Sequence, residues 1–289
     1  MKLGKQIAPR GSGPFLRLSS LSDLFRISSF GFRIFLFLVA ARARAELLPI
    51  LDAENGFYLG AAGGGKWVPF EKAKGLIKGG ETYRLYSLTA ALGTAKGGKP
   101  ESAGEPCPDV FTVALKPKPA GAVIGLAGAW NALPRVPKAL DVTQPVYQKA
   151  VADFLTAQGL RAPQVKITQL LRIDLDGDRE DEVLIAATNY FAGDGHIPAN
   201  TKAGSYSCVL LRRVVAGKVE TQLVAGEFYP KVATFNAPNG YTVTAVLDLD
   251  GDGKMEVIVN SAYYEGGACT VFRCTAKKPK QVLSVGCGA

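Results

Sequence analysis

Histidine is nearly absent from this sequence, and the motifs of several common catalytic sites are missing. His196 is the only histidine among the 289 residues, which excludes zinc sites built from several histidines and leaves one candidate general base of the usual kind. The five cysteines include no C-x-x-C pair, so neither a zinc knuckle nor a thioredoxin-type site is indicated. No G-x-S-x-G segment is present, which argues against a serine nucleophile of that type.

Two glycine-rich stretches imitate a nucleotide-binding loop but lack its decisive residue. Residues 60–66 and 93–99 both fit G-x-x-x-x-G-K. The next residue must be Ser or Thr to hold Mg²⁺. Here it is Trp67 in one stretch and Pro100 in the other, and neither stretch opens a helical pattern. The sequence therefore argues against nucleotide binding.

Hydrophobic runs long enough for a membrane span are also lacking. The apolar run at residues 34–41 is far shorter than the roughly 20 residues that a spanning helix needs. It follows Arg33 and precedes the A-x-A pattern of residues 43–45, which is typical of signal cleavage before Glu46. Residues 1–45 are therefore predicted to be a signal or leader segment, with an uncleaved anchor or a core strand as alternatives. We expect a secreted or periplasmic protein with no membrane span after leader removal.

The excess of positive charge is concentrated in this leader. Eight basic residues and only one acid, Asp23, lie in residues 1–45, whereas the rest of the chain has 26 basic and 24 acidic residues. A nucleic-acid-binding protein keeps its basic patch in the folded body. The charge distribution thus favours a protein that does not bind nucleic acid.

The remaining chain is predicted to be mainly β, an α+β protein with one helix. Short apolar runs divided by glycine and proline indicate an N-terminal β region at 46–135, in which residues 94–108 are expected to form a loop. A linker and a helix are expected at 136–163, because apolar residues recur at helical spacing from Tyr147 to Leu155. Thr143 is the expected helix cap. We expect this helix, at 143–159, to pack between the N-terminal region and the C-terminal part of the chain.

Residues 164–289 repeat one pattern of strands twice. Each unit has an apolar strand, an acidic loop and three further strands, which predicts two four-stranded antiparallel meanders that are propeller-blade-like. The predicted strands after the first loop are 182–187, 207–212 and 221–226. Those of the second unit are 242–247, 256–259, 268–273 and 281–286.

The two acidic loops carry the strongest chemical signal in the sequence. Residues 174–183 and 248–257 both fit D-L-D-G-D-x-x-x-E-V. Carboxylates at alternate positions of a tight loop repel one another unless a cation lies among them, and Ca²⁺ takes six to eight oxygen ligands. Backbone carbonyls of Glu180 and Lys254 can add to the shell. The predicted side-chain ligands are Asp174, Asp176, Asp178 and Glu182 in loop one, and Asp248, Asp250, Asp252 and Glu256 in loop two.

An EF-hand is excluded by the residues after each loop. That motif needs glutamate at loop position 12 and a helix afterwards. Position 12 is Ile185 in loop one and Val259 in loop two, and both stand in β-branched, apolar segments. The loops are therefore predicted to join strands. The alternative is that their acids form ordinary turns and bind nothing.

These loops resemble the FG-GAP or VCBS type of repeat, whose pattern is close to D-x-D/N-G-D-G-x-x-D followed by an apolar strand. Such repeats occur in integrin α-chain β-propellers and in exported bacterial proteins, and the resemblance implies Ca²⁺ held by the eight acids above. This sequence departs from the pattern in its final ligand, which is glutamate. It also has Arg179 in loop one where loop two has the usual glycine, Gly253.

Three functions remain open from the sequence. The first is an exported Ca²⁺-binding or scaffold module with a protein or glycan partner. The second is a secreted hydrolase with a site near loop 191–206, which contains His196. The third is a structural β protein whose loops bind nothing. A disulfide between Cys269 and Cys287 is also predicted, from a hairpin turn centred on Lys278.

Overall fold

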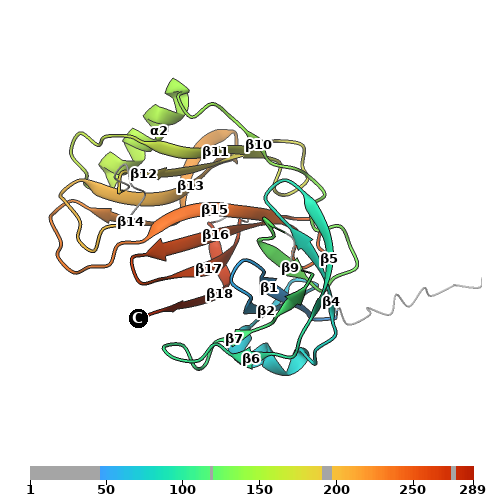
Figure 1. Cartoon of the computed structure of the whole chain (residues 1–289). Coiled ribbons are helices and arrows are strands. Elements are labelled where there is room, and N and C mark those ends of the chain that lie inside the picture. The colour runs from blue at the N-terminus through green and yellow to red at the C-terminus, as the bar shows by residue number, and fades with distance from the viewer. Residues whose placement is uncertain (1–45, 118–119, 191–196, 275–277) are drawn as a thin grey trace, which may run out of the picture. The chain divides into compact units, whose positions relative to one another are not determined.

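The computed structural model describes residues 46–117, 120–190, 197–274 and 278–289, which belong to one compact unit, Ala43–Ala289. The predicted leader, residues 1–45, lies outside the described residues. Within the described part the protein is mainly β with one long helix, as predicted, and its strands form three antiparallel sheets (Figure 1). A single-turn helix, α1 (Phe70–Ala73), and a 3₁₀ turn, η1 (Lys74–Leu76), lie in the N-terminal region.

The N-terminal region forms a curled nine-stranded sheet with the order β6-β7-β2-β1-β9-β4-β5-β8, and β3 pairs with β2. Its strands are β1 (Leu48–Asp52), β2 (Phe57–Gly63), β3 (Lys66–Pro69), β4 (Thr82–Tyr86), β5 (Ala91–Gly97), β6 (Glu101–Ser102), β7 (Phe111–Thr112), β8 (Leu115–Lys116) and β9 (Ile124–Leu126).

The prediction of a loop at 94–108 is wrong for residues 94–97, which belong to β5, and for Glu101–Ser102, which form β6. Thr94 pairs with Arg84, and β5 continues to Gly97. The small residues that suggested a loop are needed for packing, since a Cβ at Gly97 would lie 2.5 Å from the buried Tyr83 ring. A composition without large apolar residues can therefore still form a strand where a neighbouring aromatic ring covers it.

The two predicted meanders are present, and we call them the first and second blades. The first consists of β11 (Ile167–Ile173), β12 (Glu182–Thr188), β13 (Ser205–Val215) and β14 (Lys218–Tyr229), with the short β10 (Lys138–Ala139) added beside β11. The second consists of β15 (Gly240–Leu247), β16 (Glu256–Tyr263), β17 (Gly266–Arg273) and β18 (Lys280–Gly288). Consecutive strands pair antiparallel throughout both blades.

The long helix, α2 (Pro145–Ala157), covers one face of the first blade (Figure 1). Val151 and Leu155 are fully buried against side chains of β11, β12 and β13. The expected position between the N-terminal region and the blades is therefore wrong. Thr143 is also not the cap: Gln144 holds that position without a side-chain bond, while the Thr143 hydroxyl donates to Asp141 instead.

The other face of the first blade packs on the second blade. Leu171, Leu184 and Leu211 on this face belong to the same buried cluster as Val243, Val257 and Val259 of the second blade. Beyond the second blade, Leu283 of β18 lies against Gly60 of β2, where an added Cβ would be 3.0 Å from it. Both outward faces of the blade pair are therefore covered, one by α2 and the other by the N-terminal sheet.

Polar contacts join the two blades beside this apolar interface. Gln169 of β11 pairs through its side chain with both backbone groups of Val243, accepting at 3.1 Å and donating at 2.9 Å. Glu227 at the end of β14 accepts hydrogen bonds from the hydroxyl groups of Tyr229 and Tyr241 and from Asn239. These bonds fix the segment that leads from the first blade into the second.

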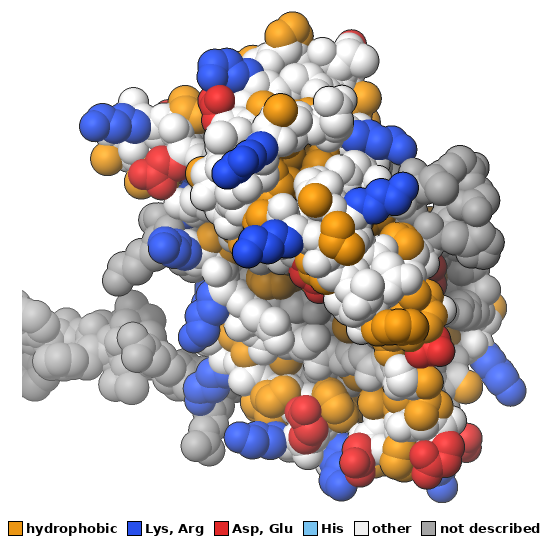
Figure 2. Space-filling view, turned by 90° about the vertical axis from the view of Figure 1, so that its left-hand side faces the viewer, with side chains coloured by type: hydrophobic (Ala, Val, Ile, Leu, Met, Phe, Trp, Pro, Cys, Tyr) orange, Lys and Arg blue, Asp and Glu red, His pale blue; other side chains and the backbone are white. Residues whose placement is uncertain are grey.

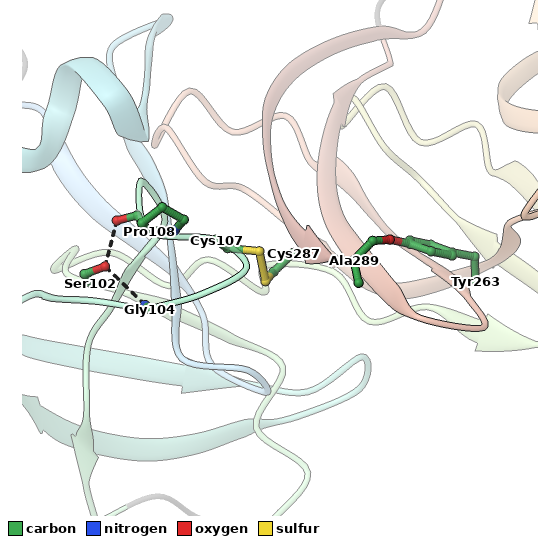
Figure 3. The surroundings of a disulfide bond; sticks show 7 residues. All are labelled: Ser102, Gly104, Cys107, Pro108, Tyr263, Cys287 and Ala289. Atoms are coloured by element: carbon green, nitrogen blue, oxygen red, sulfur yellow. Dashed lines mark hydrogen bonds between the residues drawn. A yellow bond between two sulfur atoms is a disulfide. The ribbon is translucent and has the colours of Figure 1, made fainter.

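A disulfide between Cys107 and Cys287 ties the loop after β6 to β18 (Figure 3). The predicted Cys269–Cys287 bond is wrong, because the β17–β18 register places Cys287 opposite Gly267 and Cys269 opposite Val285. The register of these two strands is therefore shifted by two residues from the one assumed. Cys208, Cys269 and Cys274 are buried free thiols.

Loss of this disulfide should destabilise the protein because the bond closes a separation of 180 residues in the unfolded chain. We expect Cys107→Ser to lower the free energy of unfolding by about 2–4 kcal/mol, measured by urea denaturation. Thiol titration of the unfolded protein checks the assignment. It should detect three free thiols in wild type and two in the control variant Cys269→Ala. An unchanged urea midpoint for Cys107→Ser, or five thiols in unfolded wild type, would contradict the assignment.

Candidate metal centre

The two acidic loops occupy equivalent places in the blades and touch each other. Loop one joins β11 to β12, and loop two joins β15 to β16. The Met255 N–H in loop two donates to the Leu175 carbonyl in loop one at 2.7 Å. The repeated sequence thus brings two similar acidic sites side by side.

Both loops are held by the same hydrogen bonds. The first aspartate, Asp174 or Asp248, accepts the N–H of the glycine three residues later, at 2.6 and 2.8 Å. The last glutamate accepts the N–H of the leucine at loop position 2, at 2.8 Å in loop one and 3.0 Å in loop two. Three further bonds are shared, each from a backbone N–H to an aspartate carboxylate. The N–H of loop position 5 donates to the aspartate at position 3, that of position 6 to position 1, and that of position 7 to position 5. The shared pattern curls each backbone so that its carboxylates converge.

The structure brings together three of the four predicted side-chain ligands in each loop. Oxygen atoms of Asp174, Asp176 and Asp178 all lie within 4.8 Å of one another, and so do those of Asp248, Asp250 and Glu256. Glu182 and Asp252 are outside these groups. The group in loop one is half-buried to exposed, whereas the three acids of loop two are 5%, 3% and 0% exposed.

Burial makes the acids of loop two electrostatically costly. Loss of solvent raises the pKa of Asp248 and Asp250, and the neighbouring Asp252 raises both further. Burial raises the pKa of Glu256 well above its usual range, and its Oε1 atom accepts no hydrogen bond. In loop one burial also raises the pKa of Glu182. A cation among the loop-two carboxylates would offset this desolvation.

Arginines beside the loops were not predicted from the sequence. Arg273, at the end of β17, forms ion pairs with Asp250, Asp252 and Glu256. Arg213 holds the equivalent position of β13, and its charge offsets part of the rise that burial causes in the pKa of Glu182. The sequence does place a basic residue near the end of the third strand of each unit. Only the pairing of the strands in the structure shows which acid this residue lies beside.

A segment that we call the strap, residues 130–135, crosses both loops. Trp130 donates from its indole N–H to the Asp248 carbonyl at 2.8 Å, and the Asp248 N–H donates to the Ala132 carbonyl at 2.8 Å. Arg135 donates to the carbonyls of Asp174, Leu175 and Gly253 at 2.6, 3.2 and 2.8 Å. The strap therefore couples the end of the N-terminal region to both acidic loops.

The glycine turn between β2 and β3 also contacts loop two. This turn belongs to one of the stretches that imitate a nucleotide-binding loop. Gly64 donates its N–H to the Asp250 carbonyl and Gly65 donates to Asp250 Oδ2, both at 3.1 Å. Their φ angles of +55° and +79° lie in the left-handed region that favours glycine. Gly65 thus binds a carboxylate within the protein, and Gly64 binds the backbone of the same residue.

Comparison with known proteins identifies one repeat. Residues 239–272 match the FG-GAP repeat. The FG-GAP match spans β15, loop two, β16 and β17 as far as Phe272. The searches of curated proteins and of solved structures found no match. An FG-GAP repeat indicates a β-repeat binding or scaffold module.

Other parts of the described chain bear on the remaining hypotheses. None of its helices is long and apolar enough to cross a lipid bilayer. On the face in Figure 2, most Lys and Arg side chains stand singly among neutral ones. His196, on which the hydrolase hypothesis depends, lies outside the described residues.

Position 6 of each loop offers a test of backbone strain. Gly253 has φ +83° and Arg179 has φ +76°, so only loop one holds a side chain in this disfavoured region. A Cβ at Gly253 meets open space. We therefore expect Gly253→Ala to lower the free energy of unfolding by about 1 kcal/mol through the backbone alone.

Arg179→Ala is the matched control, because the position already holds a side chain. It should change the free energy of unfolding by less than about 0.5 kcal/mol. Thermal and urea unfolding of both variants without added metal measures the difference. Equal effects of the two substitutions would show that position 6 is not strained as described.

Proposed function

We propose that this chain is an exported Ca²⁺-binding β-repeat protein that serves as a binding or scaffold module. The observation that carries the proposal is the loop-two cluster. Three buried carboxylates lie within 4.8 Å of one another, and Glu256 Oε1 accepts no hydrogen bond. Such an arrangement is unfavourable without positive charge close to it, because burial strengthens the repulsion between the acids, and the ion pairs of Arg273 leave Glu256 Oε1 without a hydrogen bond.

The donor set fits Ca²⁺. All the candidate ligands are oxygen atoms, which favours a hard cation over zinc or copper. Ca²⁺ also tolerates irregular shells of six to eight oxygens, whereas Mg²⁺ needs a nearly ideal octahedron. Bound Ca²⁺ would supply charge compensation and cross-link the loop. The side chains proposed to hold it are Asp174, Asp176, Asp178 and Glu182 in loop one, and Asp248, Asp250, Asp252 and Glu256 in loop two.

We extend the repeat assignment to the first blade. The family match does not include residues 164–238. Loop one nevertheless has the sequence pattern of loop two and its set of backbone-to-carboxylate hydrogen bonds. Two FG-GAP-type repeats, each with its own cation loop, account for this repetition.

Two features support export to a secreted or periplasmic location. The A-x-A pattern of residues 43–45 follows the apolar run of residues 34–41 and precedes Glu46, as at a signal cleavage site. Cys107 and Cys287 form a disulfide, and disulfides persist mainly in oxidising compartments. The partner in that location is proposed to be a protein or a glycan, bound by a scaffold that the cations hold together.

Calcium should stabilise the folded protein specifically. At a Ca²⁺ concentration ten times Kd, we expect the free energy of unfolding to rise by about 1.4 kcal/mol for each occupied site relative to EDTA. Thermal and urea unfolding in EDTA, Ca²⁺ and Mg²⁺ measure this rise. Mg²⁺ should give much less of it.

Substitutions identify the loops responsible. Asp248→Asn and Asp174→Asn should each remove the contribution of one site, and the double variant should remove all of it. Asp153→Asn is the control, because this exposed acid lies on α2 and pairs with Lys149 of the same helix. A Ca²⁺ effect that persists in the double variant, or no Ca²⁺ effect in wild type, would exclude the loops as Ca²⁺ sites.

A further inference from the structure

Arg273 lies beside the carboxylate cluster of loop two. Its Nη2 atom forms an ion pair with Asp252 and is 3.9 Å from Asp250 Oδ2. Its Nε atom is 3.7 Å from Glu256 Oε1. The guanidinium thus contacts three of the four acids that are proposed to hold Ca²⁺ in loop two.

The fit between Arg273 and the two buried acids is loose. Glu256 Oε1 accepts no hydrogen bond, and Arg273 Nε donates none. A guanidinium that served as a permanent partner would form two parallel hydrogen bonds to one carboxylate at about 2.7–2.9 Å. Arg273 therefore compensates charge at loop two without satisfying the buried oxygen.

A small divalent cation could compensate this cluster better than Arg273 does. Ca²⁺ carries twice the charge and approaches oxygen to about 2.3–2.6 Å. The longer distances of Arg273 from Asp250 and Glu256, and its partly exposed side chain, weaken its own attraction to them. Both cations cannot hold the same oxygen atoms at these distances without repelling each other.

Loop one has a different arrangement. Its carboxylate group, Asp174, Asp176 and Asp178, is half-buried to exposed. The equivalent arginine, Arg213, is buried and donates to Gln222 on β14 at 3.2 Å, so it is engaged in the sheet. Arg213 is therefore bonded within its own sheet, whereas Arg273 forms ion pairs with the acids of its loop.

We propose that Arg273 is a tethered cation that competes with Ca²⁺ for loop two. This inference rests on the proposed Ca²⁺ binding and deepens it. Ca²⁺ entry separates Arg273 from Glu256 and Asp250, so that loop two binds Ca²⁺ more weakly than its four acids alone would. Removing the charge at residue 273 therefore strengthens Ca²⁺ binding at this loop.

The test isolates loop two in the full-length protein. Asp174→Asn removes loop one, and calorimetric Ca²⁺ titration then reports loop two alone. In this background we expect Arg273→Gln to lower the Ca²⁺ Kd by at least about tenfold, which corresponds to about 1.4 kcal/mol. Arg273→Lys, which keeps the positive charge, should stay within a few-fold of the parent.

Arg172→Gln is the matched control. Arg172 also lies beside an acidic loop, but it pairs with Asp181, which is not a proposed ligand, at 3.2 Å. Its substitution should leave the Kd of loop two unchanged. A decrease of similar size in Arg172→Gln would reveal a general charge effect and overturn the specific role of Arg273.

A measurement on the parent protein, with residue 273 unaltered, avoids dependence on the folding of the variants. The ¹H–¹⁵N NMR signal of the Arg273 Nε group, assigned by its loss in Arg273→Lys, should shift as loop two fills with Ca²⁺. An unshifted signal, or an unchanged or higher Kd for Arg273→Gln, overturns the competition while leaving Ca²⁺ binding intact. Absence of Ca²⁺ binding in wild type and every variant overturns the proposed function together with this inference.

Discussion

The rest of the site depends on the crowding of three buried carboxylates in loop two. Asp248, Asp250 and Glu256 lie within 4.8 Å of one another at the contact between the second blade and the N-terminal region. Backbone N–H groups of the loop, the glycine turn after β2, the strap and Arg273 all converge on this loop. The loop N–H groups, Gly65 and Arg273 reduce part of the cost of burying negative charge, whereas the strap bonds to the loop backbone, and Glu256 Oε1 is still left without a hydrogen bond. The loop is therefore both a joint between parts of the fold and a site where three carboxylates are buried together.

The same joint explains how two blades form a stable unit without a closed ring. A pair of propeller-like blades has two outward apolar faces, and each needs a cover because a repeat cannot bury both faces alone. The helix α2 covers the first blade, and the N-terminal sheet lies against β18 of the second. The strap and the Cys107–Cys287 disulfide then connect this N-terminal cover to the blades at two separate places. The elements around the blade pair are thus caps, and the acidic loops lie where one cap is attached.

Local patterns in the sequence predicted most of the fold. Short apolar runs repeated around the duplicated acidic loop located both blades, and helical spacing located α2 (Figure 1). Contacts between distant segments were not predictable in this way. The disulfide prediction failed because the register between β17 and β18 differs by two residues from the one assumed, which places Cys287 opposite Gly267. The eight candidate ligands were named from spacing, but Trp130, Arg135 and Arg273 reach the loops only through the folded topology. No repeating pattern in the nearby sequence indicates that these residues contact the loops.

Amide hydrogen exchange with and without Ca²⁺ tests most directly the claim that a cation in loop two holds this joint together. Residues 248–256 and the strap should exchange more slowly in Ca²⁺ than in EDTA, because the Asp248 N–H is bonded to the Ala132 carbonyl and the Gly251 N–H to Asp248. Amides of α2, on the far face of the first blade, should change much less. Equal exchange of the loop and the strap in both conditions would contradict the account, since the joint would then be complete without a cation.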